Sequence, residues 1–143
     1  VEDLPRTALG RNSNEIKELI SANDALRVCF DTNHLLTEDT ADFIHNVGDK
    51  IITLHVSDYD KINERHWLPG EGVVNWKELV NALVDIGYDG PWLYEIGYEC
   101  PWSIKRDRDL TCDDFVRNAD EVLGGKEITV FSTKIEGIGM WPQ

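Results

Sequence analysis

The sequence has few cations and no long apolar run. Lys and Arg total 14 against 27 Asp and Glu, which leaves a net charge of −13 over 143 residues. This acidic excess argues against binding to a phosphate backbone or to an anionic membrane surface, because both partners require clustered cations. No apolar run approaches the roughly 18 residues that a membrane span needs. Nucleic-acid and membrane partners are therefore not expected.

Cysteine is also scarce. The three cysteines, Cys29, Cys100 and Cys112, are irregularly spaced and include no CxxC pair, so they predict neither a disulfide framework nor a paired zinc site. Cys29 is interpreted as a small buried hydrophobe. The beginning of the sequence shows no basic region followed by an apolar one, as a secretory signal would. These features favour a reduced, cytoplasmic setting. Because the first residue is Val rather than Met, we expect the chain to be part of a longer polypeptide.

Helical and extended patterns alternate along the chain. The sequence predicts helices over residues 13–23, 38–47, 75–86 and 111–123, the second of them capped by Thr37. It predicts strands over residues 26–31, 51–56 and 92–96, with a further stub at Val1-Glu2. This alternation indicates βα units and a parallel sheet. About four such units are half of a (β/α)₈ barrel, which usually takes about 250 residues, and an open doubly wound sheet is the alternative.

Polar side chains stand where each predicted strand ends. In parallel α/β folds the functional site lies at the carboxyl ends of the strands, so these side chains are expected to meet at one rim. They are Glu2, Asp31, His55 and Glu95. Two Glu, one Asp and one His offer three oxygens and one nitrogen, a set that suits a divalent cation. Each residue alone also fits a purely structural role, such as a helix cap or a buried histidine. Only the occurrence of such residues at the ends of four strands favours a metal site.

Several short motifs occur in a characteristic order. They are Glu2, Phe30-Asp31-Thr32-Asn33-His34, Leu54-His55-Val56-Ser57-Asp58, Pro69-Gly70-Glu71-Gly72 before Asn75-Trp76, Gly87-Tyr88-Asp89-Gly90, and Tyr94-Glu95. In this order they resemble the xylose isomerase-like TIM barrels, the sugar phosphate isomerase/epimerase group that is related to the apurinic endonucleases. The resemblance covers about residues 1–120. It implies the C-terminal half of an α/β (β/α)₈ TIM barrel over residues 1–125, equivalent to strands five to eight, followed by a tail over 126–143.

The resemblance also implies a metal and a reaction. Glu2, Asp31, His55 and Glu95 would bind one divalent metal, most often Mn²⁺, with Mg²⁺, Co²⁺ or Zn²⁺ as alternatives. Glu2 and Glu95 would also act as acid and base. The expected activity is isomerisation or epimerisation of a sugar or sugar phosphate, by proton transfer through a metal-stabilised enediolate.

His34 and residues of the long loop over 58–74, called the rim loop below, are candidates for substrate contacts. By the resemblance, His34 matches a position that hydrogen-bonds the sugar. In the rim loop, Arg65 could meet a phosphate or a sugar hydroxyl, His66 is a further candidate for substrate binding, and Trp67 could stack on a sugar ring. In the endonuclease branch, the equivalent of His34 and a DxH pair hold further zinc ions, and Glu64-Arg65-His66 is similar to that pair. A second metal on His34, Glu64 and His66, and with it a phosphodiesterase, is therefore an alternative, although the charge opposes it.

The resemblance lacks the first four βα units of the barrel. Those units normally carry much of the substrate pocket, and their absence leaves open sheet edges that need a partner. We therefore expect either the missing half-barrel or a second copy of the chain to complete the structure. A half-barrel that only binds or assembles, without catalysis, is the remaining alternative.

Overall fold

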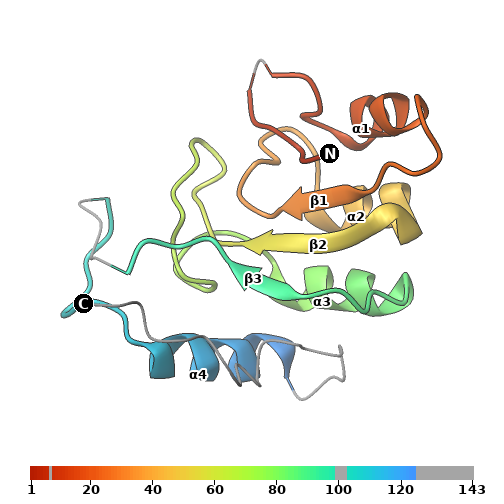
Figure 1. The fold of residues 1–143 in the computed structure, drawn as a ribbon. Helices are drawn as coiled ribbons and strands as arrows, with labels where there is room; N and C mark the ends of the chain where they lie inside the picture. The colour runs from red at the N-terminus through yellow and green to blue at the C-terminus, as the bar shows by residue number, and fades with distance from the viewer. Residues whose placement is uncertain (7, 99–102, 125–143) are drawn as a thin grey trace, which may run out of the picture.

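The computed structural model describes residues 1–6, 8–98 and 103–124 (Figure 1). Helices and strands follow one another in the order α1 (Ser13–Ile20), β1 (Val28–Asp31), α2 (Thr40–Val47), η1 (Gly48–Lys50), β2 (Ile51–Val56), α3 (Trp76–Asp85), β3 (Trp92–Tyr94) and α4 (Cys112–Leu123). Cys100 and the whole of the predicted tail, residues 126–143, lie outside the described residues. None of the helices in the described ranges is both long enough and apolar enough to span a bilayer.

The three strands form one parallel sheet in the order β1-β2-β3. The predicted stub is shorter than a strand, because Glu2 makes only an isolated parallel bridge to Cys29. In register, Asp31 pairs with His55, and His55 pairs with Leu93. Strand ends that are far apart in the sequence are thereby aligned at one edge. The prediction of βα units with a parallel sheet is confirmed.

The helices cover one side of this sheet and pack in sequence order, α1 on α2, α2 on α3 and α3 on α4 (Figure 1). Strand residues on the covered side are fully or almost fully buried, among them Phe30, Leu54 and Trp92. On the opposite side, Leu93 is 46% exposed. Because the described residues place no layer over this second side, the sheet has one buried and one open face.

Local hydrogen bonds set where the helices begin. Asn12 caps α1, since its side-chain oxygen accepts from the N–H of Glu15. The prediction that Thr37 caps the second helix is wrong: α2 begins at Thr40, and the Asp39 carboxylate accepts from the N–H groups of Ala41 and Asp42. Glu38 is engaged elsewhere, since its carboxylate accepts from the N–H and hydroxyl of Ser13 and so joins the start of α1 to α2. These tertiary contacts shift the helix start by two residues.

Candidate metal centre

The first residues of the chain lie beside β1 because two hydrogen bonds hold them there. The N–H of Cys29 donates to the carbonyl of Val1 at 2.8 Å, and the N–H of Asp31 donates to the Asp3 carboxylate at 2.7 Å. Glu2 lies between these two anchors and is bridged to Cys29. Its carboxylate is thereby directed to the same edge as the ends of the three strands.

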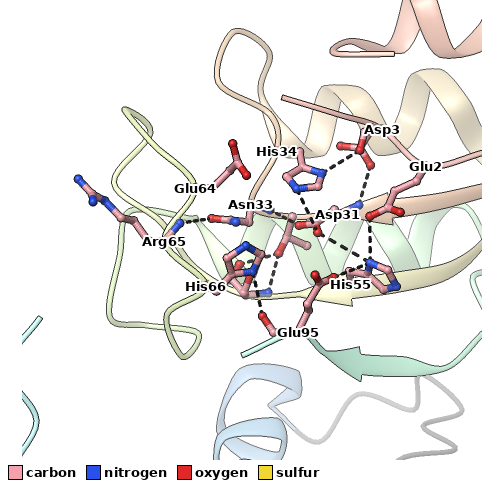
Figure 2. Close-up of polar contacts among 12 residues, drawn as sticks. Glu2, Asp3, Asp31, Asn33, His34, His55, Glu64, Arg65, His66 and Glu95 are labelled. Carbon is pink, nitrogen blue, oxygen red and sulfur yellow. Dashed lines mark hydrogen bonds and ion pairs between the residues drawn. The ribbon is translucent and has the colours of Figure 1, made fainter. Parts of the chain in front are cut away.

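Four side chains from four successive segments meet at this edge (Figure 2). Ligand atoms of Glu2, Asp31, His55 and Glu95 all lie within 4.8 Å of one another. The Nδ1 atom of His55 is at the centre: it lies 3.0 Å from Glu2 Oε1, 2.6 Å from Glu95 Oε2 and 3.8 Å from Asp31 Oδ2. The structure therefore brings together all four residues for which the sequence predicts metal binding.

Asp31 is the most buried member of this quartet, with no exposed surface. Its Oδ1 accepts from the N–H of Asn33, whereas its buried Oδ2 has no hydrogen-bond partner among the described residues. Burial raises the pKa of Asp31 to about 6; His34 and the Asn33 N–H oppose this increase and Glu95 adds to it. A buried carboxylate oxygen that no donor satisfies is a place where a cation would lower the free energy.

The residues present fit a divalent cation. Three carboxylates face one imidazole nitrogen, and a single N–H at Nδ1 cannot satisfy all three of them. A cation would neutralise their mutual repulsion and give Asp31 Oδ2 a partner. Three oxygens and one nitrogen are a hard-to-borderline set of the kind that Mn²⁺, Mg²⁺, Co²⁺ and Zn²⁺ accept.

His34 lies directly behind the quartet, with its Nδ1 2.8 Å from the carbonyl oxygen of Asp3 and its Nε2 3.5 Å from Asp31 Oδ2. A carbonyl oxygen only accepts, so Nδ1 carries the hydrogen and Nε2 is the atom turned toward Asp31. The ring is almost fully buried. His34 is therefore oriented by the same residue, Asp3, whose side chain holds the backbone of Asp31.

The rim loop places the other candidates at different distances from the quartet (Figure 2). His66 is the closest, since its Nδ1 lies 3.1 Å from the carbonyl oxygen of Glu95. The Arg65 guanidinium ion-pairs with Asp60 at 2.7 Å, and the backbone N–H of Arg65 donates to the Asn33 side-chain oxygen. Glu64 pairs with Arg6 at 3.4 Å. Neither Glu64 nor His66 belongs to a group of potential metal ligands in the described ranges.

Trp67 is buried and lies in the base of the same loop. Its backbone pairs with Asp58 through hydrogen bonds of 2.7 and 3.0 Å, and its indole N–H donates to Ser103 at 3.0 Å. Its ring also lies under the guanidinium of Arg65, 5.7 Å from the ring centroid. These contacts hold the loop after β2 against the loop after β3.

Sequence reasoning missed three residues that matter for this site. Asp3 was not identified, because an acidic residue near the beginning of a chain is ordinarily solvated. Asp58 was noted only as the last residue of a motif, yet its carboxylate accepts from the N–H groups of Tyr59, Gly70 and Val74 and from the indole of Trp76. Cys29 was treated as core, although the two-residue period of a strand puts it on the same sheet face as Asp31. Burial raises the pKa of the Cys29 thiol to about 12, and the surrounding carboxylates add to the increase.

The comparison with protein families decides which group the chain falls in. The model of the xylose isomerase-like TIM barrel matches residues 1–115. The chain belongs to this family. The resemblance drawn from the sequence motifs is confirmed, and so is the fold class, a part of an α/β barrel with a parallel sheet.

Relatives within the family include named sugar epimerases. The chain is 33% identical over 57 residues to a fructoselysine 3-epimerase of Escherichia coli O157:H7, a match over 40% of this chain and 21% of the relative. It is 33% identical over 72 residues to a D-psicose 3-epimerase of Enterocloster bolteae, a match over 49% of this chain and 22% of that protein. The matched segments are thus about a fifth of the length of these curated relatives.

Solved structures show the same fold. A D-tagatose 3-epimerase-like protein matches 86% of this chain and 45% of its own length, with a TM-score of 0.63 and 25% identity. A D-psicose 3-epimerase determined with D-fructose matches 87% of this chain and 49% of its own, with a TM-score of 0.66 and 23% identity. The chain spans about half the length of these barrels.

Proposed function

We propose that the chain is the catalytic half of a divalent-metal-dependent sugar epimerase or isomerase. The observation that carries this proposal is the convergence of Glu2, Asp31, His55 and Glu95 within 4.8 Å around a buried, unsatisfied carboxylate oxygen. The names of the relatives, fructoselysine, D-psicose and D-tagatose 3-epimerases, support a ketose or a ketose derivative as the substrate. Mn²⁺ is the proposed metal, with Mg²⁺, Co²⁺ and Zn²⁺ as alternatives.

A bound divalent cation would act as a Lewis acid on a substrate carbonyl and a neighbouring hydroxyl. This would acidify the hydrogen on the carbon that bears the hydroxyl and adjoins the carbonyl. Asp31 has no exposed surface, so its role is confined to holding the cation. The side chains of Glu2 and Glu95 are 37% and 46% exposed and can reach a substrate.

The four proposed metal ligands come from successive neighbouring segments and so form a row, with Glu2 and Glu95 at its two ends. Glu2 adjoins β1, and Glu95 follows β3 and is held there because its N–H donates to the carbonyl of Val56 at 3.1 Å. Carboxylates at the two ends can reach the two faces of one substrate carbon. One of them would remove the proton, and the other would return a proton on the opposite face, which inverts the carbon. His34 and His66, behind and beside the row, are proposed to bind substrate hydroxyls.

The central test measures bound metal and proton exchange in the same preparations. Elemental analysis of the full chain should find about one Mn²⁺ or similar ion, as one four-ligand site requires, and His55→Ala should lose it. Exchange of the carbon-bound hydrogen of D-psicose or D-fructose with solvent deuterium, followed by NMR, should fall about 100-fold or more in Glu2→Gln and Glu95→Gln. Glu78→Gln, on the exposed face of α3, is the matched control and should exchange normally.

Other outcomes would point to the alternatives. Two or three zinc ions together with cleavage of abasic DNA would indicate the phosphodiesterase, with His34, Glu64 and His66 as further ligands. Bound metal without exchange in the full chain, together with exchange in a polypeptide that also carries an N-terminal half-barrel, would indicate that the second half supplies the missing wall. We propose that this half-barrel, or a second copy of the chain, pairs with the open edges of the sheet and so encloses the exposed face at Leu93.

A further inference from the structure

A second set of potential ligands overlaps the quartet. Glu2, Cys29 and His55 come from three adjacent segments, and their ligand atoms also lie within 4.8 Å of one another. All three are only partly buried, so an ion in solution can reach them. This set shares two residues with the quartet and replaces the carboxylates of Asp31 and Glu95 by a thiol.

The strand geometry explains why the thiol faces this position. Cys29 precedes Asp31 by two residues on β1, so both side chains point to the open face of the sheet. Cys29 is bridged to Glu2 on one side and is in register with Thr53 on the other, two residues before His55. The thiol therefore lies one step down the strand from the quartet, toward the amino ends of the strands.

The two sets differ in chemical softness. The quartet offers three carboxylate oxygens and one imidazole nitrogen, which suit Mn²⁺ or Mg²⁺. The overlapping set offers one oxygen, one nitrogen and one sulfur, and thiolates select softer ions such as Cd²⁺ and Zn²⁺. Three protein ligands also leave a coordination position open for water, as in many zinc sites.

We propose that Glu2, Cys29 and His55 form a thiophilic cation site that competes with the quartet for the same two shared side chains. When Cd²⁺ or Zn²⁺ binds, the thiol releases its proton to solvent and forms the sulfur–metal bond. Because the two positions share Glu2 and His55 and are therefore adjacent, two dications there would repel each other, so a thiophilic ion and Mn²⁺ compete. The site thus makes the chain sensitive to soft metal ions, whatever sugar it acts on.

The experiment uses Cd²⁺, whose bond to a thiolate produces a ligand-to-metal charge-transfer band in the ultraviolet. Titration of the full chain with Cd²⁺ should produce this band, and added Cd²⁺ should displace bound Mn²⁺. Cys29→Ser should abolish the band while leaving Mn²⁺ binding unchanged. Cys112→Ser, at an exposed position, is the matched control and should retain the band. Glu95→Gln should retain it as well, because Glu95 belongs only to the quartet.

Each result decides the proposal. Absence of the band in the unaltered chain overturns it without recourse to any variant. A band that persists in Cys29→Ser, or that disappears in Glu95→Gln, also overturns it. The metal-dependent epimerase proposal is judged separately by Mn²⁺ binding and by solvent exchange, so a chain that binds Mn²⁺ but gives no cadmium band refutes only the thiophilic site.

Discussion

The N–H of Asp31 donates to the carboxylate of Asp3 at 2.7 Å, across 28 residues of sequence. This hydrogen bond fixes the first three residues against β1 and so places Glu2 beside the other ligands. The second oxygen of Asp3 is buried and has no partner among the described residues. Burial raises the pKa of Asp3 well above its ordinary value; the Asp31 N–H opposes this, and the charges of Asp31 and Glu2 add to it.

The Asp3 contact predicts a contrast between two substitutions. Asp3→Ala removes the acceptor of the Asp31 N–H and should weaken Mn²⁺ binding by about 10-fold or more, as loss of a supporting hydrogen bond does at other metal sites. Asp3→Asn keeps the acceptor and resembles the protonated carboxyl, so it should bind Mn²⁺ nearly as the unaltered chain does. Isothermal titration with Mn²⁺ measures both. Equal weakening in the two variants would show that the charge, not the hydrogen bond, is what matters.

Asp31 should destabilise the metal-free protein at neutral pH. Its pKa of about 6 in the folded chain lies above the value of about 4 for an unfolded one, so its contribution to stability falls as pH rises from about 4 to about 6. Asp31→Asn removes this penalty, and its amide can donate to His34 Nε2. The metal-free variant should therefore melt at a higher temperature than the unaltered chain at pH 7 and at a similar one at pH 4.

Asp60 provides a control for which we expect the opposite change in melting temperature. Although burial opposes the change, the N–H groups of Asn63 and Ile62 and the Arg65 guanidinium lower the pKa of Asp60 to about 2. Its contribution to stability is present above about pH 4 and is lost as pH falls toward 2. Asp60→Asn should thus lower the melting temperature at pH 7, where Asp31→Asn raises it. Calorimetry of metal-free samples measures both, and Mn²⁺ should then stabilise the unaltered chain but not Asp31→Asn.

Asp58 should be the main stabilising residue of the rim loop. Its buried carboxylate accepts four hydrogen bonds, from three backbone N–H groups and the indole of Trp76. Asp58→Ala leaves these donors without a partner and should lower the free energy of unfolding by about 2–4 kcal/mol. Urea denaturation measures the loss. Asp89→Asn, an exposed position two residues before Pro91, should change stability little, and a similar loss there would contradict the prediction.

Gly72 should tolerate no side chain. A Cβ at this position would lie closer than 3.0 Å to the Tyr59 carbonyl oxygen and to the Asp58 carboxylate. Gly72→Ala should therefore displace the loop and destabilise the protein by about 1–3 kcal/mol. Gly97, where a Cβ meets nothing within 4 Å, is the matched control. Comparable melting temperatures for Gly72→Ala and Gly97→Ala would refute this reading of the loop.

Much of the fold follows from local sequence patterns. Apolar periodicity placed the four helices and three strands, because each element buries one face with its own period. The start of the second helix was predicted two residues too early, at residue 38 with Thr37 as cap, because no local pattern shows that Ser13, far away in sequence, engages the Glu38 carboxylate. The hydrogen bond from Trp67 to Ser103 likewise depends on how two loops meet.

The sequence by itself determined which residue types end each strand, and with them the family and the four candidate ligands. Only the tertiary structure decided how close those ligands lie, since distances depend on strand register, such as that of Asp31 with His55, and on the anchoring of Glu2 through Asp3. The structure alone also decided the raised pKa of Asp31 and the position of the Cys29 thiol beside the site. Desolvation and proximity arise from contacts between segments distant in sequence, which no local pattern encodes.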